Sequence, residues 1–206
     1  IRTPLNAIIG FSSILDTVQT DKERKEYLRI IEYNNQLLLQ LVNDIIDLSK
    51  IEAGALELVT SNVYLDDIMR ELERAFCPKA NAAHLSLKFD DQHAECYINV
   101  DRNRLIQVLN NLISNAIRYA TSKVNITYTS NNDGFYLSVS DNGCGFSKNI
   151  LSKATNPYFT EEENHSEHFG LGLYICKILC EHHGGYLKIE NCSIGAKVTA
   201  FFKSLD

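Results

Sequence analysis

Two asparagines and an arginine near the middle of the chain have the types and spacing needed to hold a metal–phosphate group. Asn111 and Asn115 are four residues apart and Arg118 follows three residues later, so on a helix they share one side. Amide oxygens are suitable ligands for Mg²⁺, and a guanidinium forms paired hydrogen bonds with phosphate. The opposite face is apolar and contains Leu109, Leu112, Ile113 and Ala116. The pattern predicts a helix that presents Mg²⁺ and phosphate ligands, but an ordinary solvated polar face has the same appearance.

Two glycine-containing segments further along the chain could approach a nucleotide. In DNGCGF (141–146), Gly143 and Gly145 let the backbone turn closely, and Asp141 could accept a hydrogen bond from the amino group of adenine. In FGLGLY (169–174), glycines open an expected helix, where free backbone N–H groups attract an anion. Each segment alone is also compatible with an ordinary turn. The sequence contains neither a dinucleotide-binding fingerprint nor a P-loop.

The composition predicts a soluble globular protein. The 206 residues, 45% of them hydrophobic and 22% charged, suffice for one domain or two small ones. A net charge of −6 is opposite to the basic footprint of nucleic-acid-binding proteins, so no nucleic-acid partner is expected. We also expect no bilayer-spanning segment and no signal peptide. Six dispersed cysteines are expected to be reduced and mostly core thiols. Cys176 and Cys180, with His182 and His183 beyond them, lack CxxC spacing, which disfavours zinc.

Residues 1–53 have the pattern of a helical hairpin. Pro4 suits the first turn of one helix, and Thr20 is a candidate cap for a second, longer helix. Apolar residues recur at spacings of three and four along the second helix, from Leu28 to Leu48. Two helices cannot bury so long a stripe, so we expect a four-helix bundle formed by a homodimer.

Residues 54–206 have a mixed pattern that predicts an α+β sandwich, a sheet covered on one face by helices. The turn signal NNDG (131–134) lies between two β-like runs and predicts a hairpin. Residues 144–170 show little periodicity and are expected to form a long loop that acts as a lid. Strands are expected at 56–60, 85–89, 97–100, 124–129, 135–141, 186–190 and 197–203, and helices at 64–80, 101–119 and 171–183.

The order and spacing of these segments resemble the catalytic core of a sensor histidine kinase of a two-component system. The resemblance implies an α-helical hairpin that forms a dimeric four-helix bundle, followed by an α+β sandwich of the GHKL (Bergerat) ATPase fold. In the hairpin, 1–9 resembles the end of the H-box and 44–54 the second helix. The N-box, G1 box, F-box and G2 box are matched by 111–119, 141–146, 157–160 and 170–173.

The resemblance implies ATP and Mg²⁺ as cofactors. It implies that the γ-phosphoryl group passes to a histidine and then to an aspartate in the receiver domain of a response regulator. Asn115 would hold Mg²⁺, Asn111 would be the candidate catalytic residue beside it, and Asp141 would accept the adenine amino group. Further ATP contacts are implied for Arg118, Tyr119, Gly143, Gly145, Phe159, Gly170, Leu171, Gly172, Leu173 and Thr199.

The sequence departs from the family pattern in the hairpin and in the lid. The phosphoacceptor histidine and the acidic residue after it would come just before this sequence, and none of the six histidines lies in 1–53. Thr3, four residues beyond the expected histidine, matches a residue that orients water in phosphatase action. In the lid, His168 stands where a glycine is common, and Thr155 and Tyr158 stand where phenylalanine is common.

The resemblance also implies dimerisation through 1–53 and a place in the cytoplasmic portion of a membrane-bound receptor, with membrane contact only through other segments. Two alternatives stay open. GHKL ATPases of the chaperone, gyrase or mismatch-repair type have a glutamate four residues before the metal-binding asparagine, where this chain has Asn111, whose amide cannot act as a base. A pseudokinase, a non-catalytic nucleotide-binding dimerisation module, is the second.

Overall fold

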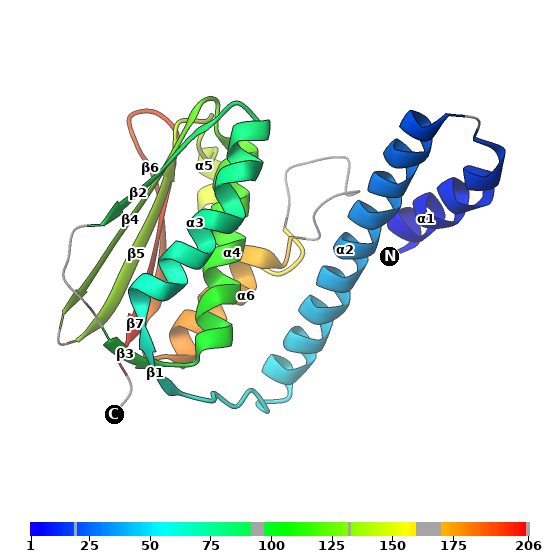
Figure 1. The fold of residues 1–206 in the computed structure, drawn as a ribbon. Helices are drawn as coiled ribbons and strands as arrows, with labels where there is room; N and C mark the ends of the chain where they lie inside the picture. The colour runs from blue at the N-terminus through cyan, green and yellow to red at the C-terminus, as the bar shows by residue number, and fades with distance from the viewer. Residues whose placement is uncertain (19, 92–96, 132, 160–169, 205–206) are drawn as a thin grey trace. The chain divides into compact units, whose positions relative to one another are not determined.

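The chain divides into two units, a helical hairpin and an α/β domain, in the computed structural model shown in Figure 1. The first unit comprises Ile1–Leu56 with Thr160–Leu171, and the second comprises Glu57–Phe159 with Gly172–Asp206. The structure describes residues 1–18, 20–91, 97–131, 133–159 and 170–204. Within these ranges, no helix combines the length and apolar content needed to cross a membrane.

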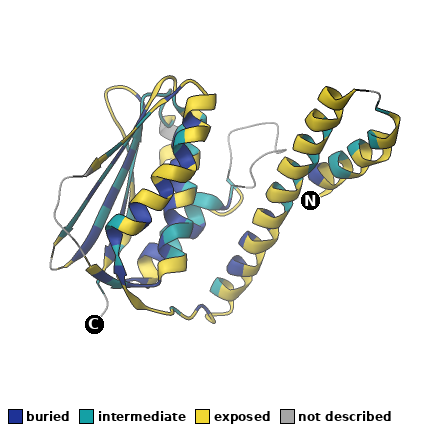
Figure 2. Ribbon diagram, in the orientation of Figure 1, coloured by how far each residue is buried: buried dark blue, intermediate teal, exposed yellow. Residues whose placement is uncertain are grey.

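The hairpin consists of α1 (Arg2–Ile14), a short 3₁₀ turn η1 (Leu15–Thr17) and α2 (Asp21–Glu52). Thr20 caps α2, because its hydroxyl oxygen accepts the Glu23 N–H at 3.2 Å. The rings of Phe11 and Tyr27 join the two helices, with centroids 5.2 Å apart. Much of both helices is exposed (Figure 2). The exposed residues include the large apolar Leu5, Ile9, Leu28, Leu39, Val42, Ile45 and Ile46. The predicted helices are confirmed, and they leave apolar surface uncovered.

Two sheets form the framework of the α/β domain. Their strands are β1 (Ser61–Tyr64), β2 (Ser86–Asp91), β3 (Tyr97–Val100), β4 (Lys123–Asn131), β5 (Gly134–Asp141), β6 (Tyr186–Asn191) and β7 (Ala196–Lys203). Strands β1 and β3 pair antiparallel, and the larger sheet has the order β2-β4-β5-β7-β6. Within it only the β2–β4 pair is parallel. The β4–β5 hairpin forms at the predicted turn, where the Asn131 side-chain oxygen accepts the N–H groups of Asp133 and Gly134.

Three helices cover one face of the larger sheet: α3 (Leu65–Ala82), α4 (Arg102–Tyr119) and α6 (Gly172–His182) (Figure 1). A fourth, α5 (Lys148–Leu151), is a single turn within the expected loop. The row Ile126, Val139 and Val198 lies in register across β4, β5 and β7, and the burial of Ile126 and Val139 places it on the face that the helices cover. The neighbouring row Thr127, Ser138 and Thr199 therefore lies on the other face, since strand side chains alternate. The predicted helix-covered α+β sandwich is confirmed.

The strand expected at 56–60 is wrong, because the structure has no strand there and β1 begins at Ser61. The segment is a linker whose backbone hydrogen bond goes to a side chain. The N–H of Val59 donates to Oδ2 of Asp101 at 2.9 Å. Local β-propensity produced the wrong prediction, because propensity carries no information about a pairing partner.

A buried histidine ties α6 to the start of α4. The His183 ring is fully buried, its Nε2 accepts the Asp101 N–H at 3.2 Å, and its Nδ1 therefore carries the proton donated to the Leu179 carbonyl at 2.7 Å. Asp101 also caps α4, since its Oδ1 accepts the N–H groups of Asn103 and Arg104. Burial lowers the pKa of His183 below its ordinary value of 6.5, so this imidazole is neutral at pH 7.

Acid is expected to destabilise the domain through His183. The folded state resists protonation of a ring whose pKa is lowered, whereas the unfolded chain takes up the proton near pH 6.5. The stabilising contribution is therefore complete above pH 6.5 and is lost as the pH falls below it, by at most about 1.4 kcal/mol per pH unit. Unfolding measured from pH 7.5 to about 5 should show a shallower pH dependence for His183→Gln than for the wild type. His182→Gln, which changes an exposed neighbour, should keep the wild-type slope; equal slopes for both variants contradict the assignment.

Candidate functional site

Helix α4 presents the predicted metal and phosphate ligands. Its buried side packs into the domain core through Leu105, Val108, Leu109, Leu112, Ile113 and Ala116. Asn111 and Asn115 lie off that side, one turn apart and half-buried. The Arg118 guanidinium lies over the Tyr119 ring, 5.4 Å from its centroid. Amide oxygens and a guanidinium are thus held on successive turns of one rigid helix.

The loop after β5 lies directly on the end of α4. A Cβ atom built on Gly143 would be 2.0 Å from the Tyr119 carbonyl oxygen, so only a glycine allows this approach. The Gly143 N–H donates to Oδ1 of Asp141 at 2.8 Å, which fixes the carboxylate relative to the loop. The structure therefore brings Asp141 and Gly143 to the same end of α4 as Tyr119.

Gly145 lies against the turn between β6 and β7. Its backbone is left-handed, with φ of 69°, and a Cβ there would be 2.9 Å from the side-chain oxygen of Asn191. Gly195 in the same turn has φ of 78°, and its Cβ would be 2.0 Å from the Asp141 carbonyl oxygen. Both glycines are required by the close contact between the two loops, and Gly195 was not predicted as a site residue.

The first residue of α6 lies against the other end of the asparagine pair. A Cβ on Gly172 would be 3.8 to 3.9 Å from the amide group of Asn111. Leu173 follows it on α6 and is half-buried. Gly170, with φ of 66°, and the buried Leu171 belong to the first unit. Along α4, Asn115 lies between the Gly172 contact and the Gly143 contact, which are about 12 Å apart along the helix.

The structure places the remaining predicted residues away from this group or at its margin. Thr199 lies on the sheet face opposite the helices, with its hydroxyl 2.8 Å from that of Ser138. Phe159 is half-buried and follows Tyr158, whose φ of 62° is unusual for a residue with a side chain. Thr3 is exposed on α1 in the first unit. The lid residue His168 lies outside the described residues.

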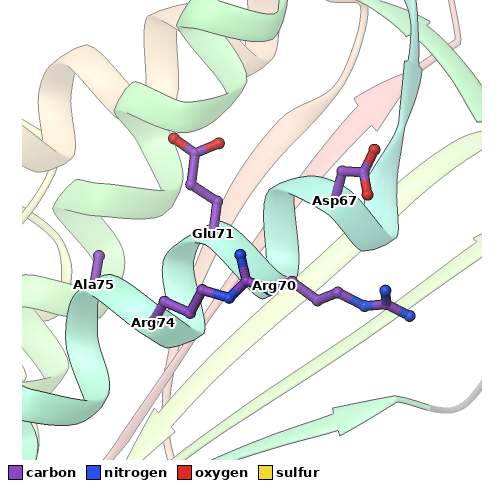
Figure 3. A pocket seen from close by; sticks show the side chains of 5 residues that line it. All are labelled: Asp67, Arg70, Glu71, Arg74 and Ala75. Carbon is purple, nitrogen blue, oxygen red and sulfur yellow. The ribbon is translucent and has the colours of Figure 1, made fainter.

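A separate surface hollow of about 590 Å³ lies along α3 and is lined by none of these residues (Figure 3). Its lining consists of Asp67, Arg70, Glu71, Arg74 and Ala75. Glu71 is held by Arg102 of α4 at 2.7 Å, and both partners are largely exposed. The mixed charges and the single contributing helix distinguish this hollow from the site around α4.

The donor set around α4 fits a magnesium-bound nucleotide. Hard amide oxygens suit Mg²⁺, a guanidinium suits phosphate, and a carboxylate at the far end of the helix suits an amino group. Within the described residues, no group of three or more His, Cys, Asp and Glu side chains is arranged to hold a metal. Cys176 and Cys180 are buried core thiols, as predicted, whereas Cys77 is half-buried and Cys144 and Cys192 are exposed; Cys96 lies outside the described residues.

Family comparisons agree with this geometry. The family described as "Histidine kinase-, DNA gyrase B-, and HSP90-like ATPase" matches residues 100–205, and the "His Kinase A (phospho-acceptor) domain" matches residues 1–54. The chain belongs to the histidine kinase family. The two matches follow one another in the order that the sequence predicted for a sensor histidine kinase core.

Curated relatives of this histidine kinase core are much longer proteins. The "Non-motile and phage-resistance protein" of Caulobacter vibrioides is 36% identical over 205 residues, covering 93% of this chain and 24% of that protein. The "Cell-division control histidine kinase PdhS" of Brucella anthropi is 34% identical over 211 residues, covering 93% of this chain and 20% of that protein. The chain thus spans about a quarter or less of the length of these two relatives.

Solved structures of histidine kinases share the fold. The Acinetobacter baumannii histidine kinase AdeS matches with a TM-score of 0.72 at 24% identity, covering 100% of this chain and 97% of that one. Full-length ShkA in complex with AMPPNP matches with a TM-score of 0.74 at 24% identity, covering 100% of this chain and 44% of that one. The nucleotide-free catalytic domain of histidine kinase ThkA matches with a TM-score of 0.63 at 29% identity, covering 72% of this chain and 97% of that one.

Proposed function

We propose that the chain is the core of a sensor histidine kinase that binds ATP with Mg²⁺ and transfers the γ-phosphoryl group to a histidine. The observation that carries the proposal is the position of Asn115 on α4, between the Gly172 contact and the Gly143 contact. In this proposal the phosphates lie toward Gly172 and the adenine toward Asp141. Residues 1–53 serve as the dimerisation and phosphotransfer hairpin, and residues 54–206 as the catalytic domain.

Catalysis in this proposal rests on positioning and charge neutralisation. The Asn115 amide oxygen holds Mg²⁺, Arg118 contacts phosphate oxygens, and Asn111 orients the phosphates next to Gly172. When bound, Mg²⁺ would neutralise negative charge that develops on the phosphate during transfer. Asn111 is not a base, because an amide does not take up a proton near neutral pH, so activation of water is disfavoured relative to transfer.

In this proposal, the residue that accepts the phosphoryl group is a histidine that does not belong to these 206 residues. An imidazole nitrogen forms a bond to the γ-phosphorus while the bond from that phosphorus to the bridging oxygen breaks, and ADP leaves with the electron pair. Residues 1–53 contain no histidine, so transfer needs one that this hairpin does not supply. The phosphoryl group then passes to an aspartate of a response regulator receiver domain. Thr3 on α1 is a candidate for orienting water in phosphatase action, the hydrolysis of that aspartyl phosphate to aspartate and inorganic phosphate.

Calorimetric titration of the chain with a non-hydrolysable ATP analogue tests nucleotide binding. We expect binding that strengthens with Mg²⁺ and prefers ATP over the guanine analogue, because the guanine base presents an acceptor where adenine has an amino group. No binding at millimolar analogue contradicts the proposal. Phosphate incorporation into a chain that includes the acceptor histidine separates a kinase from a pseudokinase, which binds ATP without transfer.

The hairpin is expected to make the chain a dimer. Its exposed apolar residues on α2, including Leu39, Val42 and Ile46, need a partner, and a second hairpin supplies matching surface. Light scattering should give a mass near twice the 23.3 kDa of one chain. A variant without residues 1–53 should be a monomer; a dimeric variant excludes the hairpin as the interface.

A further inference from the structure

We propose that Asn191 and Asn142 are positioning residues that fix the shape of the loop Asp141–Phe146, so that the Asp141 carboxylate meets the adenine base. This inference rests on the proposed function, because it assigns the adenine to that loop. The two asparagines hold opposite ends of the segment, and only Gly143, Cys144 and Gly145 lie between the anchored residues.

Asn191 holds the far end of the loop through both polar atoms of its amide. Its Oδ1 accepts the Phe146 N–H at 2.8 Å, and its Nδ2 donates to the Phe146 carbonyl at 2.6 Å. The two bonds reproduce the pairing of one residue with a neighbouring strand, so they fix the orientation of Phe146 as well as its position. Asn191 is itself the last residue of β6, where its backbone pairs with Ala196 of β7. The loop is thereby attached to the edge of the sheet.

The glycines of the loop are matched to this attachment. A Cβ on Gly145 would be 2.9 Å from Oδ1 of Asn191 and 3.1 Å from the carbonyl oxygen of Gly195. A side chain at residue 145 would therefore occupy the space that the Asn191 amide needs. The hydrogen bonds of Asn191 to Phe146 therefore require a glycine at residue 145.

Asn142 holds the near end of the loop to the start of β4. Its Oδ1 accepts the N–H groups of Ser122 at 3.0 Å and Lys123 at 2.9 Å. Its Nδ2 donates to the Ser122 hydroxyl at 2.9 Å, and its own N–H donates to the Lys123 carbonyl at 3.2 Å. With both ends held, the Asp141 carboxylate accepts the Gly143 N–H and stays aimed from a fixed backbone.

The decisive comparison is between Asn191→Ala and Asn131→Ala in the full chain. Asn131 also uses its side-chain oxygen to hold a backbone turn, but in the β4–β5 hairpin and without contact to the loop Asp141–Phe146. Loss of two hydrogen bonds predicts about tenfold weaker binding of the ATP analogue for Asn191→Ala. The preference for adenine over guanine nucleotide should narrow in the same variant. Asn131→Ala should keep both the affinity and the preference.

Asn191→Asp tests whether hydrogen bonding rather than side-chain volume is responsible. The aspartate keeps the acceptor for the Phe146 N–H but places a carboxylate oxygen where Nδ2 donates to the Phe146 carbonyl. We expect binding at least as weak as that of Asn191→Ala. Wild-type affinity in Asn191→Asp, or equal losses in Asn191→Ala and Asn131→Ala, would overturn the proposal.

Amide hydrogen exchange of the nucleotide-free chain separates this inference from the proposed function. The Gly143 N–H is bonded to Asp141 and to neither asparagine, so it reports the shape of the loop. Its exchange should accelerate in Asn191→Ala and stay unchanged in Asn131→Ala. Unchanged exchange at Gly143 in both variants contradicts a positioning role. Accelerated exchange in a chain whose wild type does not bind the ATP analogue supports the positioning role and rejects the proposed function.

Discussion

Asn115→Ala is expected to remove the Mg²⁺-dependent part of nucleotide binding while leaving the domain folded. The amide oxygen of Asn115 is the proposed ligand for Mg²⁺, and alanine offers no donor atom. Alanine also has the best helix propensity, and Asn115 lies on the half-buried side of α4 rather than in its core. We expect at least about tenfold weaker binding of the ATP analogue in Mg²⁺, equivalent to about 1.4 kcal/mol. In EDTA the variant and the wild type should bind equally.

The matched control is Asn110→Ala, which changes an exposed asparagine on the same helix. Residue 110 points about 100° away from residue 111 around the helix axis, so its side chain does not face Gly172. Calorimetry of this control should reproduce the wild-type affinity with and without Mg²⁺. If Asn115→Ala keeps the wild-type Mg²⁺ dependence, Asn115 is not the metal ligand and the proposed site loses its central residue.

Gly143→Ala is expected to weaken nucleotide binding strongly. The new Cβ would lie 2.0 Å from the Tyr119 carbonyl oxygen and 3.0 Å from Oδ1 of Asp141. The backbone oxygen belongs to the last turn of α4 and cannot rotate away, so the loop has to move. In enzymes, a misplacement of about 1 Å can lower the reaction rate about a hundredfold. We expect a loss of the same order in the affinity of Gly143→Ala for the ATP analogue.

Gly185→Ala provides the control, because it would create a clash of the same size away from the loop Asp141–Phe146. A Cβ on Gly185 would lie 1.9 Å from the Phe201 carbonyl oxygen, and Gly185 directly precedes β6. Both variants should lose stability by about 1–3 kcal/mol, the usual cost of overpacking. Only Gly143→Ala should bind the ATP analogue more weakly than its smaller fraction of folded protein explains. If Gly143→Ala and Gly185→Ala unfold to the same extent and lose the same affinity, the effect of Gly143→Ala is due to stability alone.

The helices and the strands of the larger sheet were predictable because their signals are local. Leu109, Leu112 and Ile113 recur at helical spacing in α4, and NNDG marks the β4–β5 turn without help from distant residues. The segment at 56–60 has the same β-like composition but sends the Val59 N–H to Asp101, 42 residues away. No local pattern predicts such a partner.

The site was predictable where one element carries several residues and not where distant loops meet. Asn111, Asn115 and Arg118 lie on one helix, so their common side followed from spacing alone. Asn191 contacts Phe146 across 45 residues, and an asparagine at a strand end is too ordinary to single out.

The face of the sheet on which Thr199 lies is indicated by the sequence around it. Val198, Ala200 and Phe202 alternate with it and are the inward-facing residues of β7, so the alternation already directs Thr199 to the other face. An ATP contact by Thr199 stays a prediction.

The Asp101 carboxylate joins parts of the chain that are far apart, and this has a consequence for folding. Its contact with Val59 closes a segment of 42 residues, and the contact of its backbone with His183 closes one of 82. Contacts between residues so far apart form only after the loop-closure entropy of the intervening chain is overcome, so we expect them to form late in folding. The loop Asp141–Phe146 likewise depends on β6, because Asn191 at the end of that strand holds Phe146. During synthesis, a ribosome-bound chain that has not yet extended beyond β5 therefore contains the asparagine pair of α4 but lacks β6, whose Asn191 holds the loop Asp141–Phe146.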